Sequence, residues 1–366
     1  MEKQNRKIKW LDTKITNLLN ITLPIIQAPM AGGATTPELV AAVSNAGGLG
    51  SLGAGYMTAD DIKTTIKKIK ALTNKPFAVN LFIPEKHFAT DEQIEQARKI
   101  VQASCQELNF NVNSIKPPYA PPFEEQMKVI VEEKVPVLSF TFGIPSKDWI
   151  EICKKNGIIL IGTATTLAEA KLLEEKGIDA IAAQGSEAGG HRGTFLGEAE
   201  KALNTISSLI PLFVEHTRIP IIASGGIMDA KGIATALTSG ASAVQMGTAF
   251  LCCTESGIHP LFKKLLLNTS HDNTTLTRAF SGKPARGIIN KFITRMQSHE
   301  NNILDYPIQN TLTNAMRKEA AKQNNTDFMS MWAGQGAFLC KALPAAQLIS
   351  ELNSEVIDLL KQLEQS

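Results

Sequence analysis

The sequence lacks the features of several large protein classes. Aromatic residues make up only 6% of its 366 residues, and 37 basic residues nearly balance 35 acidic ones, for a formal net charge of +2. A chain with so little excess positive charge has no bulk field to hold a polyanion, so we expect no nucleic-acid partner. No run of eighteen apolar residues occurs, so we expect no membrane-spanning helix and no membrane partner.

Cysteines are few, and their spacing suits neither disulfides nor metal. The five cysteines are odd in number and include no C-x-x-C pair. We therefore expect neither a disulfide framework nor a metal site, and the pattern favours a reducing compartment, the cytoplasm. No G-x-S-x-G, Walker A or G-x-G-x-x-G motif lies between an expected strand and a helix, where these motifs form a nucleophile elbow or a phosphate-binding loop.

A repeated unit runs through the chain: a helix-like stretch, a glycine, a short apolar strand and a loop of small residues. Two clear copies are ICKKNGIILIGTAT (152–165) and IATALTSGASAVQMGT (233–248). The glycine follows each helix, where a left-handed residue ends it at low cost. The strands are nearly all apolar, as expected when both faces are covered, and their alternation with helices predicts right-handed crossovers and a parallel sheet.

The spacing of these units predicts an α/β fold, a (β/α)8 TIM barrel, with an open doubly wound sheet as the alternative. The eight expected strands lie near 24–29, 48–53, 76–82, 136–142, 158–163, 180–184, 220–225 and 243–247. The expected helices cover 37–46, 59–71, 146–155, 166–176, 203–217 and 229–239.

Two stretches interrupt this rhythm. Residues 83–128 form an insertion after the third strand, and residues 256–339 look irregular or helical. We expect 14–255 and 340–366 to form the barrel, with 256–339 packed on it like a lid. An amphipathic helix over 343–363 is expected to close the chain.

Barrels of this class carry their active sites at the carboxyl ends of the strands. Glycine-rich turns follow the seventh and eighth expected strands there, and each leads into a helix. Such turns let backbone amides approach an anion, which predicts a phosphate site, although ordinary tight turns would look the same. The residues concerned are Gly225, Gly226, Gln245, Met246, Gly247 and Thr248.

The loop after the sixth expected strand contains His191 among glycines. Its ordinary pKa near 6.5 suits a general base, so we predict that it is catalytic. The neighbouring Glu187 and Arg192 either orient His191 or are solvated loop charges, and we favour the second interpretation. The other histidines are expected to be structural or solvated: His87, His216, His259, His271 and His299.

Polar or flexible side chains follow other strands at the same rim. Asn80 and Gln184 end two apolar strands, and their amides suit the edge of an isoalloxazine ring, although each alone fits a satisfied core group. Met30 follows the first strand and suits packing against a planar ring or burial in the core. Trp332 suits either an aromatic wall at the site or a helix-cap contact. Together these positions fit a mononucleotide such as FMN.

Six motifs, in order and with similar spacing, resemble the nitronate monooxygenases, and the match runs from about residue 14 to 345. They are QAPMAGG (27–33), GSLGAGY (50–56), AVNLF (78–82), AAQGSEAGGHRGTF (182–195), PIIASGGI (220–227) and AVQMGTAFL (243–251). RAFSGKPARGI (278–288) and MWAGQG (331–336) resemble further segments of the class I branch of that family.

The resemblance implies a flavoprotein oxidoreductase with non-covalent FMN. Met30 would lie beside the flavin ring, Asn80 and Gln184 would hydrogen-bond it, and Gly189 would contact it. The glycine-rich turns would bind its phosphate. His191 would remove the α-proton of a neutral nitroalkane or position an anionic nitronate. The implied reaction consumes O2 and releases an oxo compound and nitrite, with propionate 3-nitronate as the indicated substrate and detoxification as the role.

The same loop and turns also resemble FMN-dependent NAD(P)H reductases of the enoyl-acyl-carrier-protein or quinone type. The segments at 278–288 and 331–336 favour the monooxygenase. A non-flavin phosphate-binding barrel and a non-catalytic binding barrel are further alternatives. We expect Tyr119, Tyr306 and Trp332 to shape the pocket. The sequence leaves open a homodimer.

Overall fold

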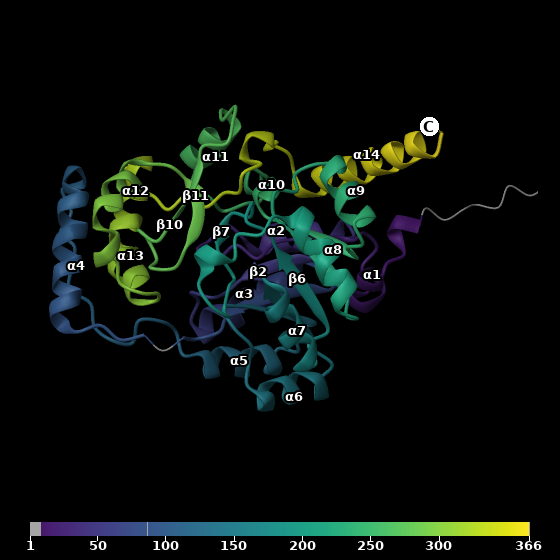
Figure 1. Ribbon diagram of the computed structural model, residues 1–366, viewed down its shortest axis with the longest axis horizontal. Coiled ribbons are helices and arrows are strands. Elements are labelled where there is room, and N and C mark those ends of the chain that lie inside the picture. The colour runs from purple at the N-terminus through teal and green to yellow at the C-terminus, as the bar shows by residue number, and fades with distance from the viewer. Residues whose placement is uncertain (1–8, 86, 366) are drawn as a thin grey trace, which may run out of the picture.

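Eight parallel strands form a barrel at the centre of the protein, as seen in a computed structural model that describes residues 9–85 and 87–365 (Figure 1). The strands are β1 (Ile25–Gln27), β2 (Gly50–Gly53), β3 (Phe77–Phe82), β4 (Val137–Thr141), β5 (Ile159–Ala164), β6 (Ala180–Gln184), β8 (Ile221–Ser224) and β9 (Ala243–Met246). Their order is β1-β9-β8-β6-β5-β4-β3-β2. A parallel bridge between Ile26 and Leu49 joins the two ends. The predicted TIM barrel is therefore confirmed, and the open sheet is wrong.

The helices predicted between the strands are confirmed to within a few residues. They are α2 (Pro37–Asn45), α3 (Ala59–Leu72), α6 (Lys147–Lys155), α7 (Leu167–Glu175), α8 (Ile206–His216), α9 (Ala230–Thr238) and the final α14 (Ala345–Gln365). Local chemistry explains where they start. The side chains of Thr36, Thr58 and Asp229, for example, each accept a hydrogen bond from a backbone amide of the first turn.

Further helices lie in the segments outside this rhythm. They are α1 (Lys14–Leu19), α4 (Asp91–Ser104), α5 (Phe123–Glu132), α10 (Thr248–Leu251), α11 (Pro260–Leu267), α12 (Lys291–Met296) and α13 (Ile308–Lys322). Short 3-10 turns are η1 (Lys9–Leu11), η2 (Gln106–Leu108), η3 (Ala199–Lys201), η4 (Gln297–Asn302), η5 (Thr326–Phe328) and η6 (Ala337–Leu339). Among the described residues, none of the helices combines the length and apolar character that crossing a bilayer requires.

A small antiparallel sheet, which the sequence did not predict, stands beside the barrel. It contains β7 (Gly190–His191), β10 (Thr274–Thr277) and β11 (Ala285–Ile288), and His191 is paired with Ala285. Every residue of β10 is half-buried, so the strand lacks the alternation of buried and exposed positions by which strands are recognised. The sheet ties the His191 loop to the segment 256–339.

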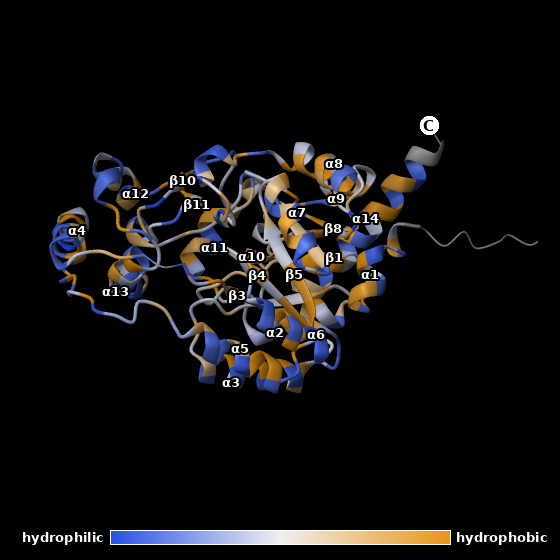
Figure 2. Cartoon of the chain, turned by 60° about the horizontal axis from the view of Figure 1, so that its bottom comes forward, coloured by the Kyte–Doolittle hydropathy of each residue, from blue (hydrophilic) through white to orange (hydrophobic). Residues whose placement is uncertain are grey.

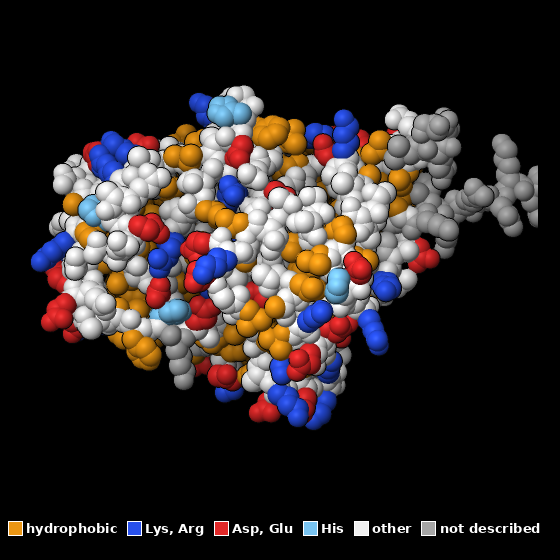
Figure 3. Space-filling model, in the orientation of Figure 1, with side chains coloured by type: hydrophobic (Ala, Val, Ile, Leu, Met, Phe, Trp, Pro, Cys, Tyr) orange, Lys and Arg blue, Asp and Glu red, His pale blue; other side chains and the backbone are white. Residues whose placement is uncertain are grey.

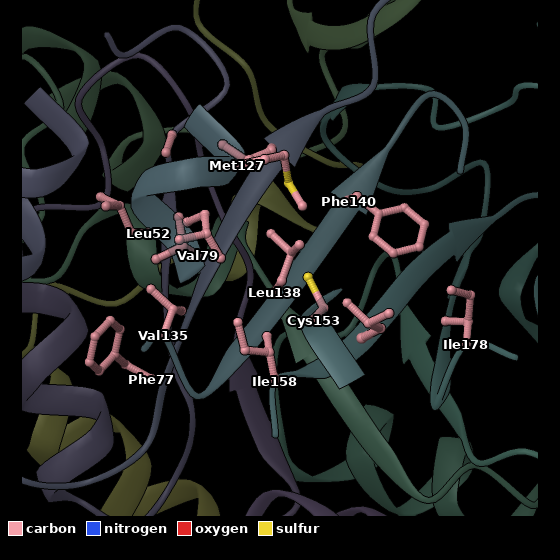
Figure 4. Packing of buried hydrophobic residues seen from close by; sticks show 14 of the residues in the cluster. Leu52, Phe77, Val79, Met127, Val135, Leu138, Phe140, Cys153, Ile158 and Ile178 are labelled. Atoms are coloured by element: carbon pink, nitrogen blue, oxygen red, sulfur yellow. The ribbon is translucent and has the colours of Figure 1, made fainter. Parts of the chain in front are cut away.

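Apolar side chains fill the layer between the barrel and its helices. Figure 4 shows Val79, Leu138 and Phe140 from the strands, with Met127 and Cys153 from the helices, and all five are fully buried. Since the strands contact apolar groups on both faces, they read as continuous apolar runs in the sequence. Figure 2 shows hydrophobic and hydrophilic residues alternating along the surrounding helices.

A second apolar cluster joins the two segments that interrupt the barrel rhythm. Val101 of α4 packs in it with Phe292 of α12 and Met316 of α13. These helices lie together at the end of the molecule away from α14 (Figure 1). The boundaries at 14–255, 256–339 and 340–366 stay a prediction. Residues 86 and 366, which fall in the predicted segments 83–128 and 340–366, lie outside the described residues.

Candidate active site

A cavity of about 1000 Å³ opens at the carboxyl ends of the barrel strands. Ten of the eleven site residues predicted from the sequence line it: Met30, Asn80, Gln184, Gly189, His191, Gly225, Gly226, Gln245, Gly247 and Thr248. Met246 is the exception, because its side chain is only 1% exposed and packs in the core. Successive residues of a strand point to opposite faces, so Gln245 reaches the cavity and Met246 cannot. The Met246 side chain therefore does not line the cavity, and a contribution of its backbone to the phosphate site stays a prediction.

The His191 ring lies in an aromatic enclosure. Ring centroids of Trp332, Phe142, Phe82 and Tyr306 lie 5.5, 5.8, 6.2 and 6.2 Å from its own. Trp332 therefore forms an aromatic wall of the site. Of the two roles that the sequence left open, an aromatic wall and a helix-cap contact, the structure supports the first. Tyr119 and Tyr306 also line the cavity.

The aromatic enclosure keeps the His191 imidazole neutral. Burial, together with the positive charges of Lys283 and Arg317, lowers the pKa of His191 to about 3. Within residues 9–85 and 87–365, no carboxylate forms an ion pair with this ring. Its Nε2 lies 2.9 Å from Ser281 Oγ. The site thus presents an uncharged imidazole with a free nitrogen lone pair.

The Gln184 side chain clamps the histidine loop onto the barrel. Its Nε2 donates to the His191 carbonyl oxygen at 2.9 Å, and its Oε1 accepts from the Gly193 amide at 2.8 Å. These contacts use one of the two N–H groups of the Gln184 amide. The second N–H has no protein partner in them and can donate to a ligand.

The buried Arg192 and the half-buried Glu187 both bond to main-chain groups, which corrects the expectation that they are solvated loop charges. Arg192 is fully buried and donates to the carbonyl oxygens of Gly185 and Ala202 at 2.6 and 3.0 Å. Glu187 accepts from the Ile206 amide at 3.0 Å, at the start of α8. The carbonyl groups of a buried loop need hydrogen-bond donors, and Arg192 supplies them. Because every residue has a main-chain carbonyl, the sequence gives no sign of which carbonyls a side chain will bind.

The glycines after β8 and β6 stand where a side chain would fill the cavity rim. Gly226 has a φ of +69°, and a Cβ there would lie 3.1 Å from Glu187 Cβ. A Cβ on Gly189 would lie 2.5 Å from the backbone of Ala333 and Gly334. The Gly334 amide in turn donates to Thr248 Oγ1 at 2.9 Å. At these positions the rim has no room for a larger side chain, so glycine is required there.

Asn80 and Met30 occupy the floor of the cavity. Asn80 is 3% exposed, and its Nδ2 donates to Ser139 Oγ at 3.0 Å. Its Oδ1 accepts from no group among the described residues, which leaves an acceptor at the cavity surface. The half-buried Met30 packs on Gly247, where a Cβ would lie 3.7 Å from the Met30 sulfur.

A cationic wall faces these residues, and sequence reasoning missed it. Arg317 of α13 lines the cavity, and its Nη2 donates to both oxygens of Asn310 at 2.8 Å. No acidic side chain in the described parts of the chain pairs with Arg317. Tyr56 lies in the same wall, where burial raises its pKa to about 12 although Arg317 opposes the rise. The spacing of Asn310, Asn314 and Arg317 on one face of α13 is the signal that could have revealed this wall.

Comparison with known proteins gives the family. The nitronate monooxygenase family model matches residues 12–355. The chain belongs to the nitronate monooxygenase family. A probable nitronate monooxygenase of Staphylococcus haemolyticus is 45% identical over 96% of this chain and 99% of its own. The chain is therefore an oxidoreductase of a flavin-dependent family, as the sequence predicted.

Solved structures agree. A nitroalkane oxidase from Streptomyces ansochromogenes superposes with a TM-score of 0.88 at 38% identity, covering 95% of this chain and 99% of that one. FabK from Thermotoga maritima is more distant, with a TM-score of 0.77 at 32% identity over 96% and 98% of the chains. These likenesses favour the monooxygenase over the reductase alternative.

The lowered pKa of His191 gives a test by NMR. We expect its ring resonances to stay constant between pH 5 and 8, because the folded protein protonates this ring only near pH 3. The unfolded chain takes up the proton near the ordinary pKa of about 6.5. Below that pH His191 therefore disfavours the folded state increasingly, until the folded pKa is reached.

The measurement is a series of histidine spectra against pH, with the His191 signal identified by its loss in His191→Asn. A His191 midpoint between pH 6 and 7 would show that the ring is hydrated and that the aromatic enclosure does not exclude water.

Proposed function

We propose that this protein oxidises alkyl nitronates with O2 to oxo compounds and nitrite, using FMN held non-covalently in the cavity. The observation that carries the proposal is the neutral, half-buried His191 ring, which lies among aromatic side chains in a cavity that Arg317 also lines. A cavity of this charge attracts an anion such as a nitronate, and propionate 3-nitronate is the substrate we favour.

The residues at the rim fit FMN. Gly225 and Gly226 have φ values of +129° and +69° and leave room for an anion at the backbone. With Gln245, Gly247 and Thr248 they would hold the phosphate, and Met30, Asn80, Gln184 and Gly189 would contact the ring. When bound, FMN supplies the electron acceptor for the nitronate and the route of those electrons to O2.

The side chains of the protein bind the anionic substrate and, for a neutral nitroalkane, remove one proton. Arg317 lines the cavity and would stabilise a negative charge there, and the aromatic rings around His191 lower the local polarity. A base with a pKa near 3 removes a proton from a neutral nitroalkane inefficiently, because general bases work best near the operating pH. The site therefore favours preformed nitronates, for which His191 needs only to position the substrate.

No contact in the cavity specifically favours the NAD(P)H reductase alternative, and the FabK neighbour is more distant than the nitroalkane oxidase. A cytoplasmic location, a homodimer and a role in detoxification stay predictions.

Replacing Gly226 with valine should weaken FMN retention. The side chain would stand at the rim of the cavity, 3.1 Å from Glu187, and block backbone approach to the phosphate. We expect the affinity for FMN to fall at least about tenfold, which corresponds to about 1.4 kcal/mol of binding free energy. The measurement is the flavin content of the protein after gel filtration.

Gly157→Val is the matched control, because Gly157 has a φ of +71° and open space around it. It carries the same backbone strain away from the cavity. Equal flavin loss in both variants, or full occupancy in Gly226→Val, would remove Gly226 from the phosphate site.

Replacing His191 with asparagine should reduce kcat/KM for neutral nitroalkanes by about 100-fold, which is the lower range for losing a general base. Preformed nitronates have no proton to lose, so their turnover should fall much less. The measurement is nitrite release from both forms of one compound. An equal loss for both forms contradicts a base role and leaves His191 with positioning alone.

A further inference from the structure

We infer that Ser281 is a positioning residue that fixes His191 in its Nε2–H tautomer and so makes Nδ1 the nitrogen that accepts a proton or meets the substrate. The inference rests on the proposed function for its catalytic meaning, but the tautomer itself follows from hydrogen bonds between residues of this chain.

The Ser281 hydroxyl has three hydrogen-bond partners. Its Oγ donates to the Lys283 carbonyl oxygen at 3.1 Å and accepts from the Lys283 amide at 3.3 Å. The third partner is His191 Nε2 at 2.9 Å. A hydroxyl has one proton and two acceptor sites. With the proton on the Lys283 carbonyl, the remaining acceptor site requires a donor, so Nε2 must carry a hydrogen.

The opposite tautomer leaves more groups unpaired. If Ser281 donated to Nε2, the Lys283 carbonyl would lose the one hydrogen bond it accepts in the described structure. Nδ1 bonds to no protein group among the described residues in either tautomer, so it does not distinguish the two. The difference is therefore the Lys283 carbonyl oxygen, and leaving a polar group unpaired costs free energy. The Nε2–H tautomer is therefore the stable one.

The position of the Ser281 hydroxyl is set by α13. Ser281 is 1% exposed. The Gln309 Nε2 donates to the Ala279 carbonyl at 2.9 Å, and the Thr313 hydroxyl donates to the Phe280 carbonyl. Both side chains are fully buried. The turn that carries Ser281 is thus anchored just before the serine, and its hydroxyl cannot follow a rotation of the imidazole.

The backbone of His191 is anchored as well. It pairs with Ala285 in the small sheet, and its carbonyl accepts from Gln184. With both partners fixed, the hydrogen bond sets the orientation of the ring and directs the unprotonated nitrogen away from Ser281. Segment 256–339 thereby contributes directly to the chemistry of a histidine that belongs to the barrel loop.

The test is 15N NMR of protein labelled at histidine, at pH 7, with His191→Asn to identify the signal. The wild type should show a protonated Nε2 and an unprotonated Nδ1 for His191, whether or not flavin is bound. Ser281→Ala should give a mixture of tautomers, and Ser281→Thr, which keeps the hydroxyl, should restore the wild-type pattern. Ser270→Ala is the matched control, because it removes the exposed hydrogen bond of Ser270 with His271.

Kinetics give the second readout. Ser281→Ala should lower kcat for neutral nitroalkanes at least about tenfold with little change in KM, while preformed nitronates lose far less. A wild-type Nδ1–H signal, or an unchanged tautomer and unchanged kcat in Ser281→Ala, overturns the inference. Absence of nitronate turnover in the wild type refutes the proposed function instead, and the spectra of the wild type then decide the tautomer alone.

Discussion

Burial of an uncharged imidazole beside positive charges is the interaction on which the chemistry of this protein depends. Burial lowers the pKa of His191, and Lys283 and Arg317 lower it further. Lys283 is itself paired with Glu85 at 2.6 Å, so Arg317, which lines the cavity, is the cation that attracts an anion there. The rings of Phe142, Tyr306 and Trp332 surround the imidazole with apolar groups, which stabilise a protonated ring less well than water does. A site built in this way is better suited to binding a nitronate than to generating one.

The barrel and the segment 256–339 make this site together. The barrel supplies the glycine-rich rim and the His191 loop, which Gln184 and Arg192 clamp through main-chain groups. The segment supplies Ser281, Arg317 and Trp332, which determine the ring's hydrogen bond, the charge of the cavity and its wall. On the face shown in Figure 3, Lys and Arg are interspersed with Asp and Glu.

Sequence patterns predicted the parts of the structure that depend on local rules. Apolar strands followed by small-residue loops located all eight barrel strands, and the rim position singled out Asn80 and Gly226. The misses share a physical cause, namely contacts between residues far apart in the chain. Arg192 is buried because main-chain carbonyls accept its protons, and β10 forms because β11 pairs with it.

The central claim is that the cavity holds a flavin which a nitronate reduces. The most direct test is the anaerobic visible spectrum of the purified protein before and after addition of propionate 3-nitronate, with NADH in a parallel cuvette. We predict a flavin spectrum that changes rapidly with the nitronate and stays unchanged with NADH. Bleaching by NADH alone would identify a reductase, and a colourless protein that takes up no added FMN would contradict the account.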